Sequence, residues 1–269
     1  MDKHANQKFY AIAARQSTNG VYFFNQLFKQ LNINAEYISS PTNNLDELLG
    51  RGIPEDLNGA SVAAPFKQCI LKYVDIMTEV AQKANSVNCI KKVGNQILGH
   101  NTDQVGLEKM FIKNQNVFGQ TPKILIYGSG GVVPSVILAI KNIVLNPIIY
   151  LSARNKNTAM AICEKHGITY IDTSETVMTD LWINATPACA QELDNILLLS
   201  QNSQSVFDLN PIQEKYPFEL HVIGRRQNFL RGFEFYKEQF LAQFEFFTEC
   251  KVQETAFDAL ASLRLGRVN

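Results

Sequence analysis

Short apolar runs alternate with amphipathic stretches along the first part of the chain. Two stretches, Phe23 to Leu31 and Cys69 to Lys83, carry apolar side chains at the spacing of a helix that buries one face. The shorter runs are typical of strands, and they span Phe9 to Ala14, Ala35 to Ile38, Ser61 to Ala64, Val87 to Lys92 and Gln96 to Gly99. Strands that alternate with helices predict a largely parallel α/β sheet.

A second series of elements begins near Val105. Its predicted strands span Lys123 to Tyr127, Pro147 to Leu151, Thr169 to Ile171, Leu181 to Asn184 and Ser205 to Leu209. Its predicted helices span Val132 to Asn142 and Thr158 to His166. This succession predicts a doubly wound, Rossmann-type nucleotide-binding domain.

From Gly232 onward the chain becomes strongly aromatic, with helical spacing. The first series of elements lacks a layer that would close its sheet, so we expect this tail to return to it. The predicted fold class is therefore a two-domain α/β protein. Residues 1–104 and 234–269 are expected to form a substrate and catalytic domain, and residues 105–233 a dinucleotide-binding domain.

Composition narrows the function classes. The 269 residues are 46% hydrophobic and 19% charged, with zero formal net charge, which is ordinary for a globular protein. Basic residues occur only as isolated doublets such as Lys91-Lys92, so nucleic acid is not an expected partner. The five cysteines are scattered and odd in number, which argues against a disulfide framework or a metal site. Because neither a signal peptide nor a membrane span is recognisable, we expect a cytoplasmic protein without a membrane partner.

A glycine-rich loop, formed by Gly128, Ser129, Gly130 and Gly131, follows a predicted strand and opens a predicted helix. In that context glycines let the backbone approach a pyrophosphate, which then lies at the helix N-terminus. Val133 departs from the usual fingerprint, which has glycine or alanine there. The loop predicts dinucleotide binding, with a plain strand-to-helix turn as the alternative.

The end of the next strand indicates which dinucleotide. An NAD site places an acidic residue about 20 positions after the loop, but here the chain reads Ser152-Ala153-Arg154-Asn155-Lys156. Arg154 can pair with a 2′-phosphate, and Lys156 can add charge. We therefore expect NADP as the cofactor; the alternative is that both cations are solvated surface residues.

The motifs then resemble, in order, those of the shikimate dehydrogenase family. Ser61 to Lys67 is similar to its N-V-T-x-P-x-K segment, Ala84 to Cys89 to A-x-x-V-N-T, and Gly99 to Gly106 to G-x-N-T-D-x-x-G. The glycine loop, Ala153-Arg154, Asn184-Ala185-Thr186 and Gly232 to Gln239 follow in the family order. Arg15 to Gly20 resembles the R-x-S-x-x-G loop of the shikimate-dehydrogenase-like branch.

The resemblance implies reversible, NADP-dependent reduction of 3-dehydroshikimate to shikimate, a step toward chorismate and the aromatic amino acids. It implies that Lys67 and Asp103 are a catalytic dyad and that Asn88 and Gln239 bind substrate hydroxyls. Reduction of a ketone needs a hydride and a proton, and a lysine beside a carboxylate can supply the proton. Without the motifs, such a pair would most often be a structural salt bridge. The resemblance adds Ser152, Asn184 and Thr186 to the cofactor-binding residues.

The part of the substrate pocket that binds the carboxylate in the family departs from the family pattern here. Two serines of the first loop become Thr18 and Gly20, the asparagine and threonine of N-V-T become Ser61 and Ala63, and Pro211 stands where the family has a tyrosine. Each lost hydrogen bond weakens binding by on the order of 1 kcal/mol. We expect Arg15, Ser17, Thr18 and Ser61 to hold the acid group, with poor affinity for shikimate itself.

Two other functions remain open from the sequence. One is a non-catalytic, NADP-responsive binding protein that retains the fold, and the other is a dehydrogenase for an unrelated substrate. The favoured reading is a dehydrogenase for shikimate or a related cyclic hydroxy acid such as quinate. The chain is expected to be a monomer or a homodimer.

Overall fold

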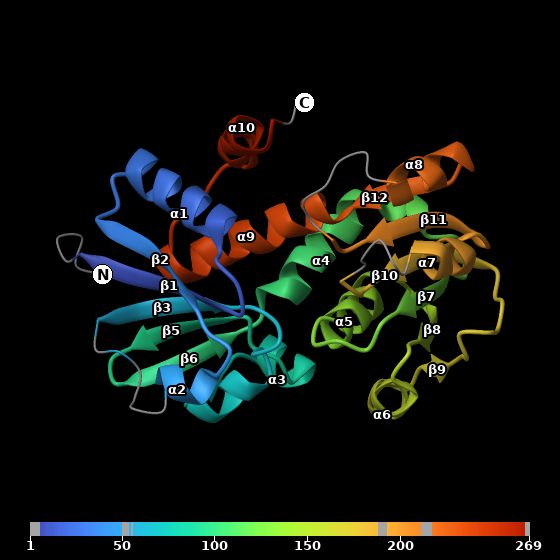
Figure 1. The fold of residues 1–269 in the computed structure, drawn as a ribbon, viewed down its shortest axis with the longest axis horizontal. Helices are drawn as coiled ribbons and strands as arrows, with labels where there is room; N and C mark the ends of the chain where they lie inside the picture. Colours follow the sequence, from blue (N-terminus) through green and yellow to red (C-terminus); the bar gives the residue numbers. More distant parts are fainter. Residues whose placement is uncertain (1–5, 50–53, 55, 188–192, 211–216, 267–269) are drawn as a thin grey trace. The chain divides into compact units, whose positions relative to one another are not determined.

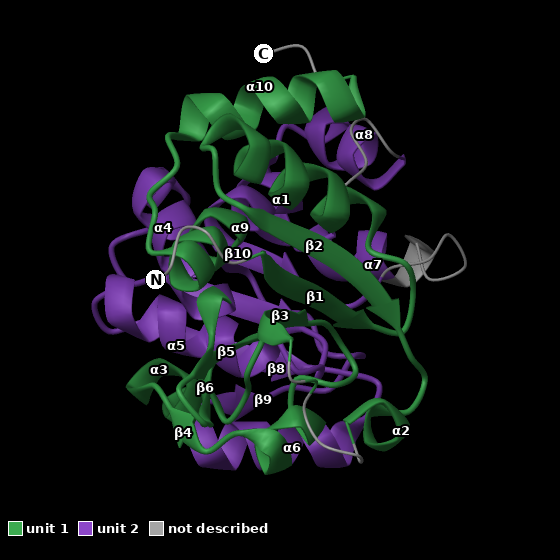
Figure 2. Cartoon of the chain, turned by 90° about the vertical axis from the view of Figure 1, so that its left-hand side faces the viewer, with its two compact units in different colours: residues 1–102, 240–269 green, residues 103–239 purple. Residues whose placement is uncertain are grey.

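The computed structural model describes residues 6–49, 54, 56–187, 193–210 and 217–266 (Figure 1). The chain forms two compact units, which Figure 2 distinguishes by colour. Unit 1 contains residues 1–102 and 240–269, and unit 2 contains residues 103–239. The sequence placed these boundaries at 104/105 and 233/234.

Unit 1 is built on one mixed sheet. Its strands are β1 (Gln7–Ala13), β2 (Ala35–Pro41), β3 (Leu57–Val62), β4 (Ile76–Met77), β5 (Cys89–Val93) and β6 (Gln96–His100). Their order is β2-β1-β3-β5-β6-β4. The β1 strand pairs in parallel with β2 and β3, whereas β5 is antiparallel to both β3 and β6. The predicted largely parallel sheet is therefore parallel on one side and antiparallel in the β5–β6 hairpin.

Helices cover both faces of this sheet. They are α1 (Thr18–Gln30), α2 (Leu45–Leu49), the 3-10 helix η1 (Cys69–Tyr73), α3 (Glu79–Ala84), the last part of α9 (Gly232–Thr248) and α10 (Glu254–Leu265). One face packs aliphatic residues against α2, η1 and α3. The other face is aromatic. The ring centroids of Phe9 and Phe247 are 5.1 Å apart in a stacked pair, and those of Phe23 and Phe257 are 4.9 Å apart. The predicted return of the C-terminal helices is confirmed, because these phenylalanines complete the core of unit 1.

Unit 2 carries a fully parallel sheet. Its strands are β7 (Lys123–Tyr127), β8 (Ile148–Ser152), β9 (Thr169–Tyr170), β10 (Thr179–Asn184), β11 (Ser203–Asp208) and β12 (Asn228–Arg231). The spatial order is β12-β11-β10-β7-β8-β9, which is the doubly wound order with a reversal between β7 and β10. The sequence-predicted Rossmann arrangement is confirmed.

The helices of unit 2 lie on both faces of its sheet. They are α4 (Thr102–Lys113), the 3-10 helix η2 (Gln115–Val117), α5 (Val133–Ile143), α6 (Lys156–His166), α7 (Leu193–Ser200), α8 (Pro217–Gly224) and the first part of α9. One face of the sheet packs with α4, α5 and α6, and the other packs Trp182 with α7 and α8. The near-continuous apolar strands follow from this double coverage.

One predicted element is wrong. The helix expected over Cys69 to Lys83 is divided into η1, β4 and α3. Asp75 interrupts it, because its backbone N–H donates to the Ile97 carbonyl at 3.0 Å and its Oδ2 accepts the Ile97 N–H at 2.7 Å. Thr78 then caps α3 by accepting the Ala81 N–H. The apolar spacing of this stretch is typical of a helix, and it carries no information about the hydrogen bonds between Asp75 and Ile97.

No helix among the described residues is long and apolar enough to cross a membrane. Four cysteines lie in the described ranges and take part in no disulfide bond: Cys69, Cys89, Cys163 and Cys250. Cys189 lies outside the described residues.

Candidate active site and dinucleotide site

The glycine loop lies where the strand order of unit 2 reverses. Gly128 follows β7 with φ of +131°, a backbone conformation that disfavours other residues. Its N–H donates to the Ser152 carbonyl at 2.8 Å. A Cβ at this position would lie 2.8 Å from the Ala185 carbonyl oxygen. Glycine is therefore required to bring the ends of β7 and β10 this close together.

A cavity of about 200 Å³ opens over this loop. It is lined by Tyr127, Gly128, Ser129, Gly130, Ala153, Arg154, Asn155, Ala185, Thr186 and Pro187. A shallower cavity of about 600 Å³, lined by Arg154 to Asn157, shares two of these residues. A Cβ at Gly130 or Gly131 would meet nothing within 4 Å, so the loop backbone is open to a ligand. The two adjoining cavities fit an extended phosphate-bearing molecule such as a dinucleotide.

The N-terminus of α5 suits an anion. Pro134 stands in its first turn, no acidic residue is present there, and Val132 provides no side-chain cap. The positive end of the helix dipole therefore lies beside the glycine loop without a side-chain cap or an acidic neighbour, which favours an anion there.

The basic end of the site is exposed, as a phosphate contact requires. Arg154 follows the buried strand β8 and faces both cavities. Asn155 caps α6 by accepting the Thr158 N–H at 3.1 Å, which fixes the turn that carries Arg154. Lys156 lies over the Tyr170 ring, with Nζ 5.4 Å from its centroid.

Two residues expected to contact the cofactor are buried. Ser152 is almost fully buried, and its carbonyl supports the glycine loop. Asn184 is also buried, and its Oδ1 accepts the N–H of Thr186 at 3.1 Å and its hydroxyl at 2.7 Å. Thr186 lines the cavity, so Asn184 acts on the site through Thr186.

In unit 1, the segment that carries Lys67 is tied to a buried turn. The Lys67 carbonyl accepts the Val87 N–H at 2.9 Å. The next residue, Asn88, is 3% exposed; its Oδ1 accepts the Thr102 N–H at 2.8 Å, and its Nδ2 donates to the Thr102 hydroxyl at 2.9 Å. Asp103 follows Thr102 directly. One asparagine therefore connects the lysine segment to the turn that bears the carboxylate.

Asp103 occupies the first turn of α4 and is 3% exposed. A carboxylate at a helix N-terminus is stabilised by the helix dipole. Asn101 holds the turn from the other side, because its Nδ2 donates to the Ser86 carbonyl at 2.9 Å. His100 is fixed by a 2.8 Å hydrogen bond to the Thr78 hydroxyl and stacks on Phe246. Burial lowers the pKa of His100, which favours its neutral form.

Gln239 lies against the same helix. A Cβ at Gly106 would be only 2.7 Å from the Gln239 N and 2.9 Å from its Cβ. The last glycine of the G-x-N-T-D-x-x-G segment is thus the point where α4 and α9 meet. The structure brings these two family motifs together within unit 2.

Hydroxyl groups gather where β2, β1 and β3 end in register. Ser39 and Ser61 both pair with Ala11 of β1, so their side chains share one face of the sheet. The Ser61 hydroxyl and the Tyr37 phenol are hydrogen-bonded to each other, and Ser39 Oγ accepts the Ser17 N–H at 2.9 Å. Tyr37 is held by Phe24, whose ring stacks on it at 4.1 Å.

The other residues expected to hold the acid group differ in position. Ser17 is half-buried at the start of α1, and its Oγ would lie 2.5 Å from a Cβ at Gly20. Ser17 thus occupies the space of a side chain at position 20. Arg15 and Thr18 are exposed beside it. Pro211 lies outside the described residues.

Sequence reasoning missed Tyr37. No motif contains it, and its proximity to Ser61 depends on strand pairing through β1. The one available signal was its position in the predicted strand Ala35 to Ile38, two residues before Ser39.

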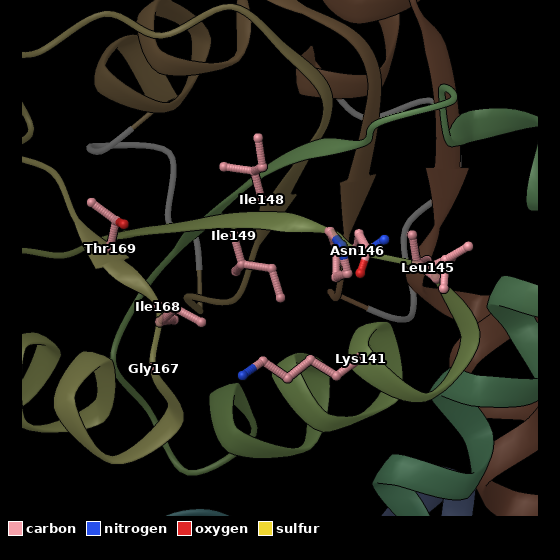
Figure 3. A pocket seen from close by; sticks show the side chains of 10 residues that line it. Lys141, Leu145, Asn146, Ile148, Ile149, Gly167, Ile168 and Thr169 are labelled. Carbon is pink, nitrogen blue, oxygen red and sulfur yellow. The ribbon is translucent and has the colours of Figure 1, made fainter.

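A third cavity, of about 610 Å³, lies at the N-terminal ends of strands β8 and β9 (Figure 3). It is lined by the end of α5, the start of β8 and the turn before β9, including Lys141, Ile148 and Gly167. Lys141 donates to the His166 carbonyl. None of the predicted site residues lines it. Within the described ranges, no cluster of three or more histidine, cysteine, aspartate or glutamate side chains could hold a metal ion.

Comparison with known proteins identifies the family. Residues 15–90 match the shikimate dehydrogenase substrate binding domain. The chain is 33% identical over 217 residues to a shikimate dehydrogenase (NADP(+)) of Pelagibacter ubique, covering 79% of this chain and 77% of that protein. The chain belongs to the shikimate dehydrogenase family.

The predicted similarity to the shikimate-dehydrogenase-like branch is also confirmed. The chain is 26% identical over 244 residues to a shikimate dehydrogenase-like protein of Haemophilus influenzae, covering 88% of this chain and 89% of that protein. A solved shikimate 5-dehydrogenase-like protein superposes with a TM-score of 0.82 over 97% of this chain and 98% of that one, at 24% identity. The shikimate complex of the Thermus thermophilus shikimate 5-dehydrogenase gives a TM-score of 0.83 at 18% identity, covering 97% and 100% of the two chains. These solved structures confirm the fold.

Proposed function

We propose that this protein is an NADP-dependent oxidoreductase that interconverts shikimate, or a closely related cyclic hydroxy acid such as quinate, with its 3-dehydro ketone. The observation that carries the proposal is the buried Asn88–Thr102 pair, which connects the Lys67 segment to the turn bearing Asp103. Burying polar groups costs free energy unless they are hydrogen-bonded, so an asparagine and an aspartate buried in neighbouring segments call for a structural or functional reason. The relatives named as NADP-dependent shikimate dehydrogenases support the same reaction.

The proposed cofactor fits the residues present. The glycine loop and the N-terminus of α5 would hold the pyrophosphate, and Arg154 would pair with the 2′-phosphate. Bound NADPH supplies the hydride that forms the new C–H bond at the substrate carbonyl carbon.

The proton is the task of this chain's own residues. As the carbonyl oxygen gains negative charge, the ammonium group of Lys67 donates a proton from Nζ, and the ketone becomes an alcohol. In the oxidative direction, neutral Lys67 Nζ takes that proton back. Asp103, in the first turn of α4, is proposed as the second member of the dyad. Asn88, whose amide oxygen and amide nitrogen both hydrogen-bond Thr102, keeps this turn in place.

The carboxylate of the substrate is proposed to face the hydroxyl cluster of Ser17, Ser39, Ser61 and Tyr37. A hydroxyl that donates to an ionised carboxylate makes a charge-assisted hydrogen bond, but Gly20 and Ala63 offer no hydroxyl where the family pattern has serine and threonine. The exposed Arg15 is the residue that would add charge. This composition supports the proposal of weak affinity for shikimate, with a related acid as the preferred substrate.

The competing proposal is an NADP-responsive binding protein without turnover. The rebuilt hydroxyl cluster favours it, since a changed substrate pocket is what loss of activity would leave. The intact Lys67, Asn88 and Asp103 favour catalysis.

The test is turnover with purified protein, NADP, and shikimate and quinate as alternative substrates, followed at the absorbance of NADPH. Lys67→Ala is expected to reduce kcat by about 10²- to 10⁴-fold and to leave the Kd for NADP unchanged. Lys72→Ala is the matched control, because Lys72 is an exposed lysine of the same unit that pairs with Asp46 on the surface.

Equal loss of activity in Lys67→Ala and Lys72→Ala would contradict the assignment of Lys67. Tight NADP binding by the wild-type protein with no turnover on either acid would favour the binding protein.

A further inference from the structure

A second layer of polar residues lies behind the dinucleotide cavity. Asn184 and Asp208 end the neighbouring parallel strands β10 and β11 and are in register with each other. Both side chains are fully buried. Polar groups at this depth normally have a structural or functional reason, because burying a carboxylate without compensation is costly.

One oxygen of Asp208 accepts three hydrogen bonds. Its Oδ1 accepts Asn184 Nδ2 at 3.0 Å, the Asn210 backbone N–H at 3.1 Å and Asn210 Nδ2 at 2.9 Å. A carboxylate can only accept. It therefore dictates that both amides present their NH₂ groups to it, and that the oxygen of Asn184 faces the other way.

That orientation fixes Thr186. The Asn184 Oδ1 accepts both the N–H and the hydroxyl of Thr186, at 3.1 Å and 2.7 Å. Asn210 Nδ2 also donates to the Thr186 carbonyl at 3.2 Å. Three polar groups of one cavity-lining residue are thus held by two amides that Asp208 orients.

The glycine loop is packed against Ala185 and Thr186. A Cβ at Gly128 would lie 2.8 Å from the Ala185 oxygen and 3.1 Å from Thr186 Cγ2. The Ala185 N–H also donates to the Tyr127 carbonyl at 2.8 Å. The wall formed by Ala185 and Thr186 and the loop that faces the phosphates are therefore in contact through backbone atoms.

We propose that Asp208 is a positioning residue for the dinucleotide, which sets NADP affinity by orienting Asn184 and Asn210 against Thr186. The inference rests on the proposed function, because it takes the cavity over Gly128 to be the NADP site. Asp208 is too deeply buried to contact the cofactor, and it acts through the two asparagines. The second oxygen, Oδ2, has no hydrogen-bond partner among the described residues. The oxygen that orients the amides is Oδ1 alone.

Because only Oδ1 accepts hydrogen bonds from the described residues, two substitutions of Asp208 separate the acceptor from the rest of the side chain. Asp208→Asn can keep a carbonyl oxygen at Oδ1, so the three hydrogen bonds survive. Asp208→Leu fills a similar volume but offers no acceptor, which leaves the amides of Asn184 and Asn210 free to rotate away from Thr186. Asn210→Ala removes one of the two amides and leaves the other in place.

The measurement is the Kd for NADPH, followed by energy transfer from Trp182, the sole tryptophan, with the thermal midpoint of each apo variant measured alongside. We expect Asp208→Asn to keep the Kd within about threefold, Asn210→Ala to raise it about threefold to tenfold, and Asp208→Leu to raise it tenfold or more at a temperature where it is folded. Asp180→Asn is the matched control, because Asp180 lies on the same strand as Asn184 and accepts the Lys123 N–H at the far end of the sheet.

A merely structural role predicts that NADPH affinity follows the thermal midpoint through the whole set. That result, or an unchanged Kd in folded Asp208→Leu, would overturn the inference. If Asp208→Leu fails to fold, the same question is decided by Asn210→Ala, whose unchanged Kd would also overturn it. Absence of NADPH binding by the wild-type protein would instead reject the proposed function.

Discussion

At the scale of a single side chain, Arg154 is the residue that we propose selects NADP over NAD. It is exposed, it borders both cavities, and the strand before it ends without an acidic residue. We expect Arg154→Ala to raise the Kd for NADP by about 10- to 100-fold, the range for loss of a hydrogen bond to a charged group. The Kd for NAD should stay within about twofold, because NAD has no 2′-phosphate.

Titration of Trp182 fluorescence with each dinucleotide checks this expectation. Lys165→Ala is the control, because Lys165 is an exposed cation near the C-terminal end of α6, the helix that follows Arg154. A Kd for NADP that does not change in Arg154→Ala would contradict the assignment.

Asp208 also predicts how stability depends on pH. Burial raises the pKa of its carboxyl to about 6, against three hydrogen bonds that lower it. The charged neighbour in register, Arg231, is paired with Glu219. Because the folded state binds the proton more tightly than the unfolded state, the stabilising effect of protonation is complete below about pH 4 and is lost as pH rises through 6. The free energy of unfolding attributable to Asp208 should therefore fall by about 3 kcal/mol between these limits.

Urea unfolding at pH 5 and pH 8, for wild type and Asp208→Asn, isolates this contribution. Burial lowers the pKa of His100 and His166, which acts in the opposite direction below pH 6.5, and the difference between the two proteins cancels both. Asp208→Asn should gain stability relative to wild type at pH 8 more than at pH 5. An equal difference at the two pH values would contradict the raised pKa.

At the scale of elements, the sequence predicted a helix or strand correctly where the residues that define it are neighbours in the chain. The β7 strand, the glycine loop and α5 were predicted to within a residue, because an apolar strand, a glycine run and an early proline lie consecutively in sequence. The stretch after Cys69 failed for the opposite reason. Its division depends on Asp75 bonding to Ile97, a partner that no local pattern can reveal.

The candidate site divides in the same way. Lys67, Asn88 and Asp103 could be proposed from the sequence because each lies in a motif. The meeting of Tyr37 with Ser61 depends on register across three strands, and the clamp around Thr186 depends on two parallel strands ending together. Pairings of this kind are tertiary, so the sequence predicted the members Ser61, Asn184 and Thr186 but not the partners that hold them.

At the scale of the whole molecule, unit 1 is assembled from both ends of the chain. Phe240, Phe244, Phe247 and Phe257 fill its aromatic face. Truncation after Gln239 should leave residues 6–102 unfolded, because loss of a buried phenylalanine side chain costs about 3–5 kcal/mol and a whole domain is stable by about 5–15 kcal/mol. Amide hydrogen exchange in β1 and β3 measures the effect.

Truncation after Gly266 is the control for that experiment, because it removes only the last three residues. Protected amides in β1 and β3 of the shorter chain would show that unit 1 holds together without its C-terminal helices.

The two-segment construction also sets an order of events during synthesis. Unit 2 is continuous in the chain, so it can complete its core while unit 1 still lacks the helices that cover Phe9, Phe23 and Phe24. At about 5–20 residues per second, the ribosome needs roughly 8 to 30 s to travel from residue 102 to Phe257. For that interval the N-terminal segment cannot bury these phenylalanines, which makes it the segment where a chaperone would first be needed.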